Sequence, residues 1–224
     1  MPATASPAKG AARRYRSPLR ERRTAETRQS LLAAATRLFG TLGWQGTGMR
    51  EVAAEAGVAT ETLYAHFPSK RALLQGVVDV AVAGDDEPVA VADRPEFAAM
   101  GRGSLAERTA AAARLLAGIY GRTAAFSKVI RQAAGSDAEM ADELRATRER
   151  QRTDVEASIG LILGREPTPM ERDGVWAVTS PDVYCLLVDD SGWTPEQYEQ
   201  WMSGALERLL KPERKRAHEK GTGR

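Results

Sequence analysis

Residues 47–70, TGMREVAAEAGVATETLYAHFPSK, predict two short helices joined by a tight turn at Gly57. A glycine at this point suits a chain that must adopt a positive φ, which other residues resist. The first helix repeats apolar residues at helical spacing: Met49, Val52, Ala53 and Ala56. Two helices with such a turn form a helix-turn-helix, whose second helix can enter the major groove of DNA.

The second helix of this stretch is predicted to have one anchored face and one polar face. Leu63 and Phe67 lie four residues apart and would pack on a core, and Pro68 would end the helix. Ser69 could cap the next helix, with Lys70 near a phosphate. The polar face carries hydroxyl, imidazole and carboxylate groups: Thr60, Glu61, Thr62, Tyr64 and His66. Hydroxyl and imidazole groups suit base edges and phosphates.

Three segments around the turn extend the pattern: RQSLLAAATRLF at 28–39, GWQGT at 43–47 and TLYAHFPSKRALL at 62–74. With the turn, they resemble the N-terminal domain of the tetracycline-repressor (TetR) family of transcriptional regulators over residues 24–80. The resemblance implies an all-α protein. It would have an N-terminal three-helix helix-turn-helix domain and a larger helical domain for ligand binding and dimerisation.

The resemblance also implies which residues contact DNA. Thr60 and Thr62 would lie on the recognition helix, and Arg50 would touch a base or a phosphate. Tyr64 and His66 would join Lys70 in contacting phosphates. The predicted interface comprises Thr47, Gly48, Arg50, Ala59, Thr60, Glu61, Thr62, Tyr64, His66 and Lys70.

Two positions of this interface leave alternatives open. Gly48 stands where members of the family usually have serine or threonine, whose hydroxyl caps the helix and often touches a phosphate. Thr47 could substitute for that hydroxyl. Glu61 would either accept a hydrogen bond from a cytosine amino group or stay solvated.

Composition predicts a soluble, cytoplasmic, globular protein. Of the 224 residues, 42% are hydrophobic and 28% charged, typical of one or two domains with real cores. The longest apolar runs are short and broken by charge, so we expect neither a membrane span nor an export signal. Cys185 is the only cysteine, which excludes a disulfide within the chain.

Motifs of enzyme sites are missing from the sequence. There is no Gly-x-Ser-x-Gly elbow, phosphate-binding loop or dinucleotide fingerprint. His66 and His218 lack the spacing of metal ligands. We therefore expect no enzymatic activity, no metal and no cofactor.

Positive charge collects at both ends of the chain. Residues 1–23 hold seven basic side chains and one acidic, and residues 212–224 hold five basic and two acidic. We interpret the first as a disordered basic arm placed to follow phosphates or enter a minor groove, or else as a merely solubilising tail. The second is interpreted as a basic tail.

The rest of the chain divides by periodicity into a DNA-binding domain at 24–70, a connecting helix at 71–83, a linker loop at 84–103 and a regulatory and dimerisation domain at 104–211. Helices of the last domain are predicted at 104–120, 123–134, 136–163, 168–179, 181–189 and 195–210. Ser136 followed by Glu139 predicts a capping box.

Aromatic residues suggest two further sites in this domain. The C-terminal run resembles a branch of TetR-like proteins in which the last two helices pair with a second subunit, which implies a homodimer. Trp193, Tyr198 and Trp201 would contribute there or to the core of one subunit. An apolar pocket for a small apolar or amphipathic effector is predicted beside Tyr120, Phe126, Trp176 and Tyr184; the alternative is that these aromatics are core.

The predicted function is that of a dimeric DNA-binding transcriptional regulator. We expect a repressor that a small ligand releases from a palindromic operator. One alternative is an activator or architectural DNA-binding protein without an inducer. Another is a ligand-binding protein that retains only the fold.

Overall fold

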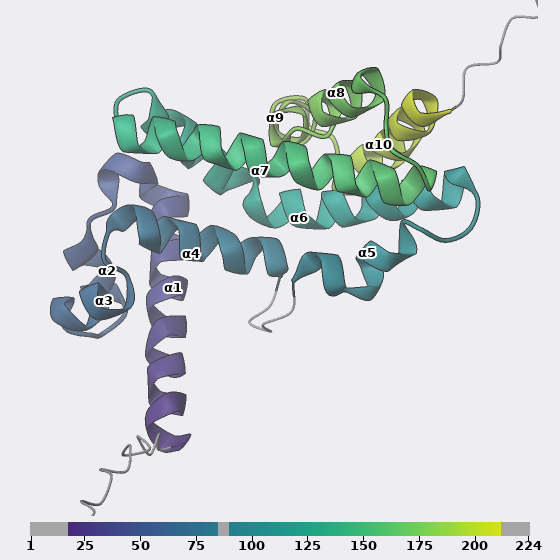
Figure 1. Ribbon diagram of the computed structural model, residues 1–224. Helices are drawn as coiled ribbons and strands as arrows, with labels where there is room; N and C mark the ends of the chain where they lie inside the picture. Colours follow the sequence, from purple (N-terminus) through teal and green to yellow (C-terminus); the bar gives the residue numbers. More distant parts are fainter. Residues whose placement is uncertain (1–17, 85–89, 212–224) are drawn as a thin grey trace, which may run out of the picture.

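The computed structural model describes residues 18–84 and 90–211, and within them every regular element is a helix (Figure 1). The predicted basic tail lies outside the described residues. The elements are α1 (Pro18–Gly46), α2 (Met49–Glu55), α3 (Thr60–His66), α4 (Lys70–Ala83), η1 (Val91–Asp93), α5 (Pro95–Ala99), α6 (Leu105–Ala134), α7 (Ala138–Leu163), α8 (Pro169–Val178), α9 (Pro181–Tyr184), a π-helical turn η2 (Cys185–Asp190) and α10 (Pro195–Leu210).

Helix α1 begins at Pro18, within the stretch expected to form the basic arm. The disordered arm expected for residues 1–23 is therefore wrong where it overlaps this helix, and the remainder lies outside the described residues. Proline suits the first position of a helix, and Arg22 Nε donates to Glu26 Oε1 at 3.1 Å one turn later. Charged residues that look like a flexible arm are thus equally suited to an exposed helix. In Figure 1 this part of α1 projects beyond α2 and α3.

The expected linker at 84–103 contains η1 and α5, and the helices expected at 104–120 and 123–134 form one helix, α6. Gly121 between them does not interrupt α6. A glycine in a helix costs about 1 kcal/mol, which burial of neighbouring side chains on α6 readily offsets. A Cβ added at Gly121 would lie 3.6 Å from the Tyr184 hydroxyl, which is an ordinary van der Waals contact, so the packing there does not require glycine.

Helix caps agree with the sequence except at α7. Ser69 accepts a hydrogen bond from Ala72 N at 3.1 Å, as predicted for the start of α4. The cap of α7 is Asp137, which accepts from Met140 N at 3.2 Å, and not Ser136. Both side chains can cap, and they stand one residue apart, so the sequence alone did not separate them.

Two hydrophobic cores divide the protein, and α6 contributes to both. The first lies among α1 to α4 and takes in the C-terminal part of α6, where Phe126 and Ile130 are buried. The second lies among α6, α7, α8, α9 and α10 and includes Tyr120 and Tyr198. The unit formed by α1 to α4 therefore packs directly on the larger domain, with α1 and α4 in contact with α6 (Figure 1).

A chain of tyrosines lies inside the second core. The Tyr184 ring is 5.9 Å from the Tyr120 ring and 4.8 Å from the Tyr198 ring, both edge-on. The Tyr120 hydroxyl donates to the Thr179 carbonyl. The Tyr198 hydroxyl is buried without a partner in the described part of the chain. Burial raises the pKa of both hydroxyls, so both stay protonated.

We expect Tyr198→Phe to leave the free energy of unfolding unchanged or raise it by up to about 1 kcal/mol, because it removes an unpaired buried polar atom. Tyr120→Phe is the matched control. It should lower this free energy by about 1 kcal/mol, since it leaves the Thr179 carbonyl unpaired. Urea unfolding measures both. A larger loss for Tyr198→Phe than for Tyr120→Phe would contradict the unpaired state of Tyr198.

Candidate nucleic-acid interface

The α2–turn–α3 unit has the geometry that its sequence predicts. Gly57 adopts φ 68°, and Val58 N donates to Ala53 O at 3.0 Å across the turn. Val52 and Ala53 of α2 are buried, as is Leu63 of α3. These contacts fix one side of α3 against the first core and leave its other side toward solvent.

The open side of α3 carries most of the predicted DNA-contacting residues. Tyr64 is 49% exposed, and Glu61 is also exposed. Thr60 and Thr62 are half-buried at the same surface. Ala59 caps α3 in an extended conformation with φ −68° and ψ 146°. The structure thus leaves three hydroxyl groups of α3 at least partly open to solvent, with that of Tyr64 the most exposed.

At the start of α2 the structure differs from the expected interface. Thr47 is only 1% exposed, and its hydroxyl donates to Gly43 O at 2.9 Å, so it cannot take the place of the missing serine or threonine. Gly48 caps α2 without a side chain. A Cβ at Gly48 would lie 2.0 Å from Glu51 Oε2, so the Glu51 carboxylate occupies the space of a capping side chain. Of this group, Arg50 alone presents an exposed side chain.

Lys70 lies against the protein. Its ammonium donates to the Trp44 carbonyl and sits 4.3 Å from the centre of the Trp44 ring. Burial lowers the pKa of Lys70, although Asp137 and Glu51 nearby act in the opposite direction. A phosphate contact by Lys70 therefore requires its side chain to leave Trp44. His66 is half-buried, with its ring 6.5 Å from that of Phe67.

Arg28 is a contact that sequence reasoning missed. Its guanidinium carbon lies 4.5 Å from the centre of the Phe67 ring and so ties α1 to the end of α3. Arg37 makes a similar tie to α2, because its Nη2 is 2.9 Å from Glu55 Oε1. Both arginines are well separated in sequence from their partners, so no local sequence pattern predicts these contacts. They hold the two motif helices on α1.

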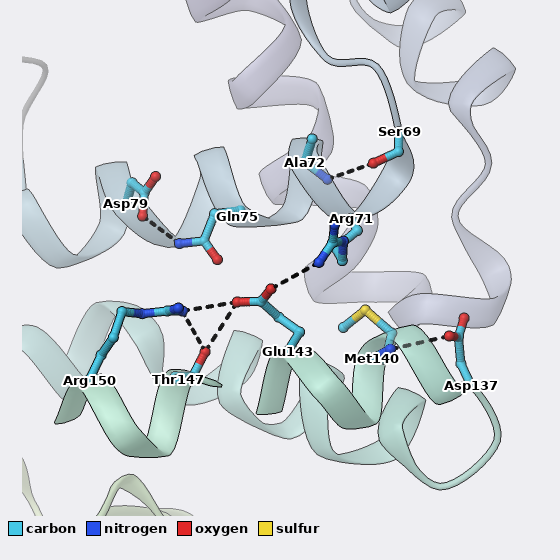
Figure 2. A network of polar contacts seen from close by, with 10 residues as sticks. All are labelled: Ser69, Arg71, Ala72, Gln75, Asp79, Asp137, Met140, Glu143, Thr147 and Arg150. Carbon is cyan, nitrogen blue, oxygen red and sulfur yellow. Dashed lines mark hydrogen bonds and ion pairs between the residues drawn. The ribbon is translucent and has the colours of Figure 1, made fainter. Parts of the chain in front are cut away.

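A polar network joins the start of α4 to α7 (Figure 2). Glu143 of α7 is its centre, with a side chain only 15% exposed. Its Oε2 accepts from Arg71 Nη1 at 3.4 Å, and its Oε1 accepts from Arg150 Nη2 at 2.9 Å and from the Thr147 hydroxyl at 3.3 Å. Arg71 follows Lys70 directly in the chain, so this network links the segment that follows α3 to α7.

We expect a double-mutant cycle with Arg71→Ala and Glu143→Ala to give a coupling free energy of about 0.5–1 kcal/mol, because one partner is largely buried. The matched control is the exposed pair Arg145 and Asp142, also on α7, whose coupling should be about 0–0.5 kcal/mol. Urea unfolding of the four proteins in each cycle measures both values. Equal coupling in the two cycles would contradict a specific link between α4 and α7.

The aromatics proposed for a pocket do not lie together. Tyr120 and Trp176 border a cavity of about 390 Å³ among α6, α7, α8 and α9. Phe126 packs in the first core, Tyr184 packs edge-on between two tyrosines in the second, and neither is among the residues that line the cavity. Periodicity marks all four as buried but does not tell which core each one enters. The cavity is lined by Tyr120, Ser127, Ile130, Arg131, Leu144, Thr147, Arg148, Gln151, Val155, Trp176, Ala177, Thr179, Ser180, Pro181 and Asp182.

The C-terminal aromatics separate into core and surface. Tyr198 is fully buried within its own subunit, which confirms the core alternative for this residue. Trp193 and Trp201 are half-buried, with ring centres 6.2 Å apart. Exposed apolar side chains on α8 and α10 include Met170, which is 83% exposed. These helices thus keep apolar groups at the surface.

The described residues show neither a metal cluster nor a membrane span. Within 18–84 and 90–211, His, Cys, Asp and Glu side chains nowhere gather in threes that could hold a metal ion. No helix in these ranges is both long enough and apolar enough to cross a bilayer.

Comparison with known proteins relates the chain to one family. The family described as "Bacterial regulatory proteins, tetR family" matches residues 31–77. The HTH-type transcriptional regulator LmrA of Bacillus subtilis is 44% identical over 43 residues, 19% of this chain and 23% of LmrA. The HTH-type transcriptional activator FasR of Mycolicibacterium smegmatis is 44% identical over 63 residues, 26% of this chain and 29% of FasR. The chain thus matches about a quarter of the length of these relatives.

The likeness to solved structures extends over both domains. The crystal structure of the multidrug binding protein EbrR complexed with malachite green has a TM-score of 0.55 and 25% sequence identity, and the match covers 81% of this chain and 96% of EbrR. The helix-turn-helix and the larger helical domain therefore occur together in the same all-helical arrangement. Residues 31–77 thus match the TetR family of bacterial regulatory proteins, and the fold of the two domains is similar to that of EbrR.

Proposed function

We propose that the protein is a dimeric transcriptional regulator that reads DNA with α3. The observation that carries this proposal is the solvent side of α3, where Tyr64 is exposed and Thr60 and Thr62 are half-buried, while Leu63 is fixed in the core. Two copies related by a twofold axis would place two such helices in successive major grooves of a palindromic operator. Such a protein works where the chromosome lies, in the cytoplasm.

The larger domain would control DNA binding through a ligand. We propose that a small molecule in the cavity beside Trp176 favours a distance between the α3 helices of the two subunits that fits DNA poorly. The protein would then be a repressor that the ligand releases from its operator. The Glu143 network supports this route, because α7 lines the cavity and also holds Arg71 at the start of α4. EbrR, with its bound malachite green, supports a ligand role for a domain of this fold.

An activator is the second candidate. The relative FasR carries that description and matches this chain at 44% identity over 63 residues. In an activator of this kind, the same helix α3 would bind the operator, and this binding would promote transcription and not block it. The sign of regulation therefore depends on where the operator lies relative to the promoter.

The proposal is tested by fluorescence anisotropy of the purified protein on DNA from beside its own gene, over a salt series, with a random duplex as control. We expect much tighter binding to its own DNA, a steep salt dependence and two subunits per site. Equally weak binding to both duplexes, with intact folding, would favour a ligand-binding protein that retains only the fold.

A further inference from the structure

The cavity beside Trp176 carries an unbalanced positive charge. Its wall holds three charged side chains, Arg131, Arg148 and Asp182. Arg131 pairs with Asp182, so these two charges offset each other. Arg148 of α7 lines the cavity and is exposed, and it forms no hydrogen bond or ion pair with any described residue. One guanidinium is therefore left to meet a ligand.

The charges just outside the cavity offset each other and leave this asymmetry in place. Arg152 lies 5.4 Å from the centre of the Trp176 ring and also pairs with Asp173. A cationic ligand would find no unpaired carboxylate in the described wall, since Asp182 is already engaged, and it would be repelled by Arg148. An anionic ligand would gain a charge-assisted hydrogen bond at Arg148 without breaking an existing pair.

The rest of the wall suits an apolar body. Ile130, Leu144, Val155 and Trp176 border the cavity from three helices. Its volume of about 390 Å³ lies within the range of small-molecule sites. Uncharged polar groups, among them Thr147, complete the lining. The site thus offers an apolar surface with one cation at its edge.

We propose that this cavity binds an amphipathic anion, with its apolar part against Val155 and Trp176 and its carboxylate or similar group at Arg148. The inference rests on the proposed function in that this anion would be the effector. Arg148 follows Thr147, whose hydroxyl donates to Glu143, so an anion at Arg148 binds next to the network that holds Arg71. The proposed head-group site and the link to α4 lie close together on α7, between Glu143 and Arg148.

Calorimetric titration with octanoate, octanol and octylammonium tests the inference, because the three probes share an eight-carbon chain and carry an anionic, a neutral and a cationic head group. We expect octanoate to bind at least fivefold more tightly than octanol, and octylammonium to bind most weakly. Arg148→Gln should reduce octanoate binding to the level of octanol, and Arg148→Lys should retain part of the preference. The control Arg145→Gln changes an exposed arginine of the same helix that does not line the cavity, and it should bind like the wild type.

Equal binding of the three probes, no binding of any of them, or an unchanged octanoate affinity in Arg148→Gln would overturn the inference. The calorimetry contains no DNA, so its outcome is separable from that of the anisotropy experiment. Charge-selective binding by a protein that does not read DNA would keep the anion site and reject the regulator. Specific DNA binding without charge selectivity would do the reverse.

Discussion

Replacing Gly76 by leucine is expected to lower the free energy of unfolding by about 2–3 kcal/mol. Gly76 is buried on α4, where a Cβ would lie 2.9 Å from Phe67 Cε1 and 3.1 Å from Leu32 Cδ2. Both neighbours belong to the first core, so they cannot move without disturbing the seat of α3. The higher helix propensity of leucine offsets about 1 kcal/mol of the cost.

The matched control is Gly40→Ala. Gly40 is exposed within α1, and a Cβ there would meet nothing within 4 Å. This substitution should raise the free energy of unfolding by about 0.5–1 kcal/mol, because it restricts the unfolded chain and suits the helix. Urea unfolding measures both variants. A neutral Gly76→Leu would show that α4 and Phe67 are not packed as described.

Replacing Tyr64 by alanine is expected to weaken binding to the operator and to random DNA alike, by about tenfold or more. Tyr64 stands on the outer face of α3, 49% exposed, while the neighbouring Leu63 holds the helix in place. The loss of the Tyr64 side chain should therefore remove a contact with the DNA phosphates without unfolding the domain. Anisotropy titrations of both duplexes measure the effect, and Gln200→Ala, at an exposed position of α10, serves as the control.

Thr62→Ala provides the contrast to Tyr64→Ala. A hydroxyl that contacts a base should affect only certain operator positions, with a cost of about 1–3 kcal/mol at those positions. If Thr62→Ala weakens binding to random DNA as much as binding to the operator, the assignment of Thr62 as a base contact is wrong. If Tyr64→Ala leaves random DNA unaffected, Tyr64 is not a phosphate contact.

The helix-turn-helix could be predicted because its signals are local. The positive φ of Gly57, the Ser69 cap and the burial of Leu63 all follow from residue types at fixed short spacing. The surface of α3 follows from the same periodicity. For this reason the solvent side of α3 with Thr60 and Tyr64 could be predicted without knowing how the other helices pack.

Residues with distant partners could not be placed in this way. Lys70 lies on Trp44 in another helix. Thr47 has a near partner, Gly43, but its inward orientation follows a bend of α1 at Gly43, where φ is 66°, which helical spacing does not reveal. Phe126 was assigned to the pocket, but α6 passes through both cores, and periodicity shows that a residue is buried without showing in which core. The Glu143 network likewise joins helices that are far apart in sequence.

The long helix α6 gives the two domains a common element. Its C-terminal part packs on α1 to α4, and it borders the cavity through Tyr120 in its middle and Ile130 near its C-terminal end. Ile130 belongs to the first core and also lines the cavity. A ligand that moves Ile130 would therefore change the packing of the core shared with α1 to α4, in addition to the Glu143 network.

Selection of binding sites from a pool of random DNA duplexes tests the central claim most directly. We predict that the wild-type protein enriches a palindromic sequence whose half-sites lie one helical turn apart or a multiple of it. A variant with Thr60, Thr62 and Tyr64 all replaced by alanine should enrich no sequence while remaining folded. Enrichment of the same sequence by this variant, or no enrichment by the wild type, would contradict recognition of DNA by α3.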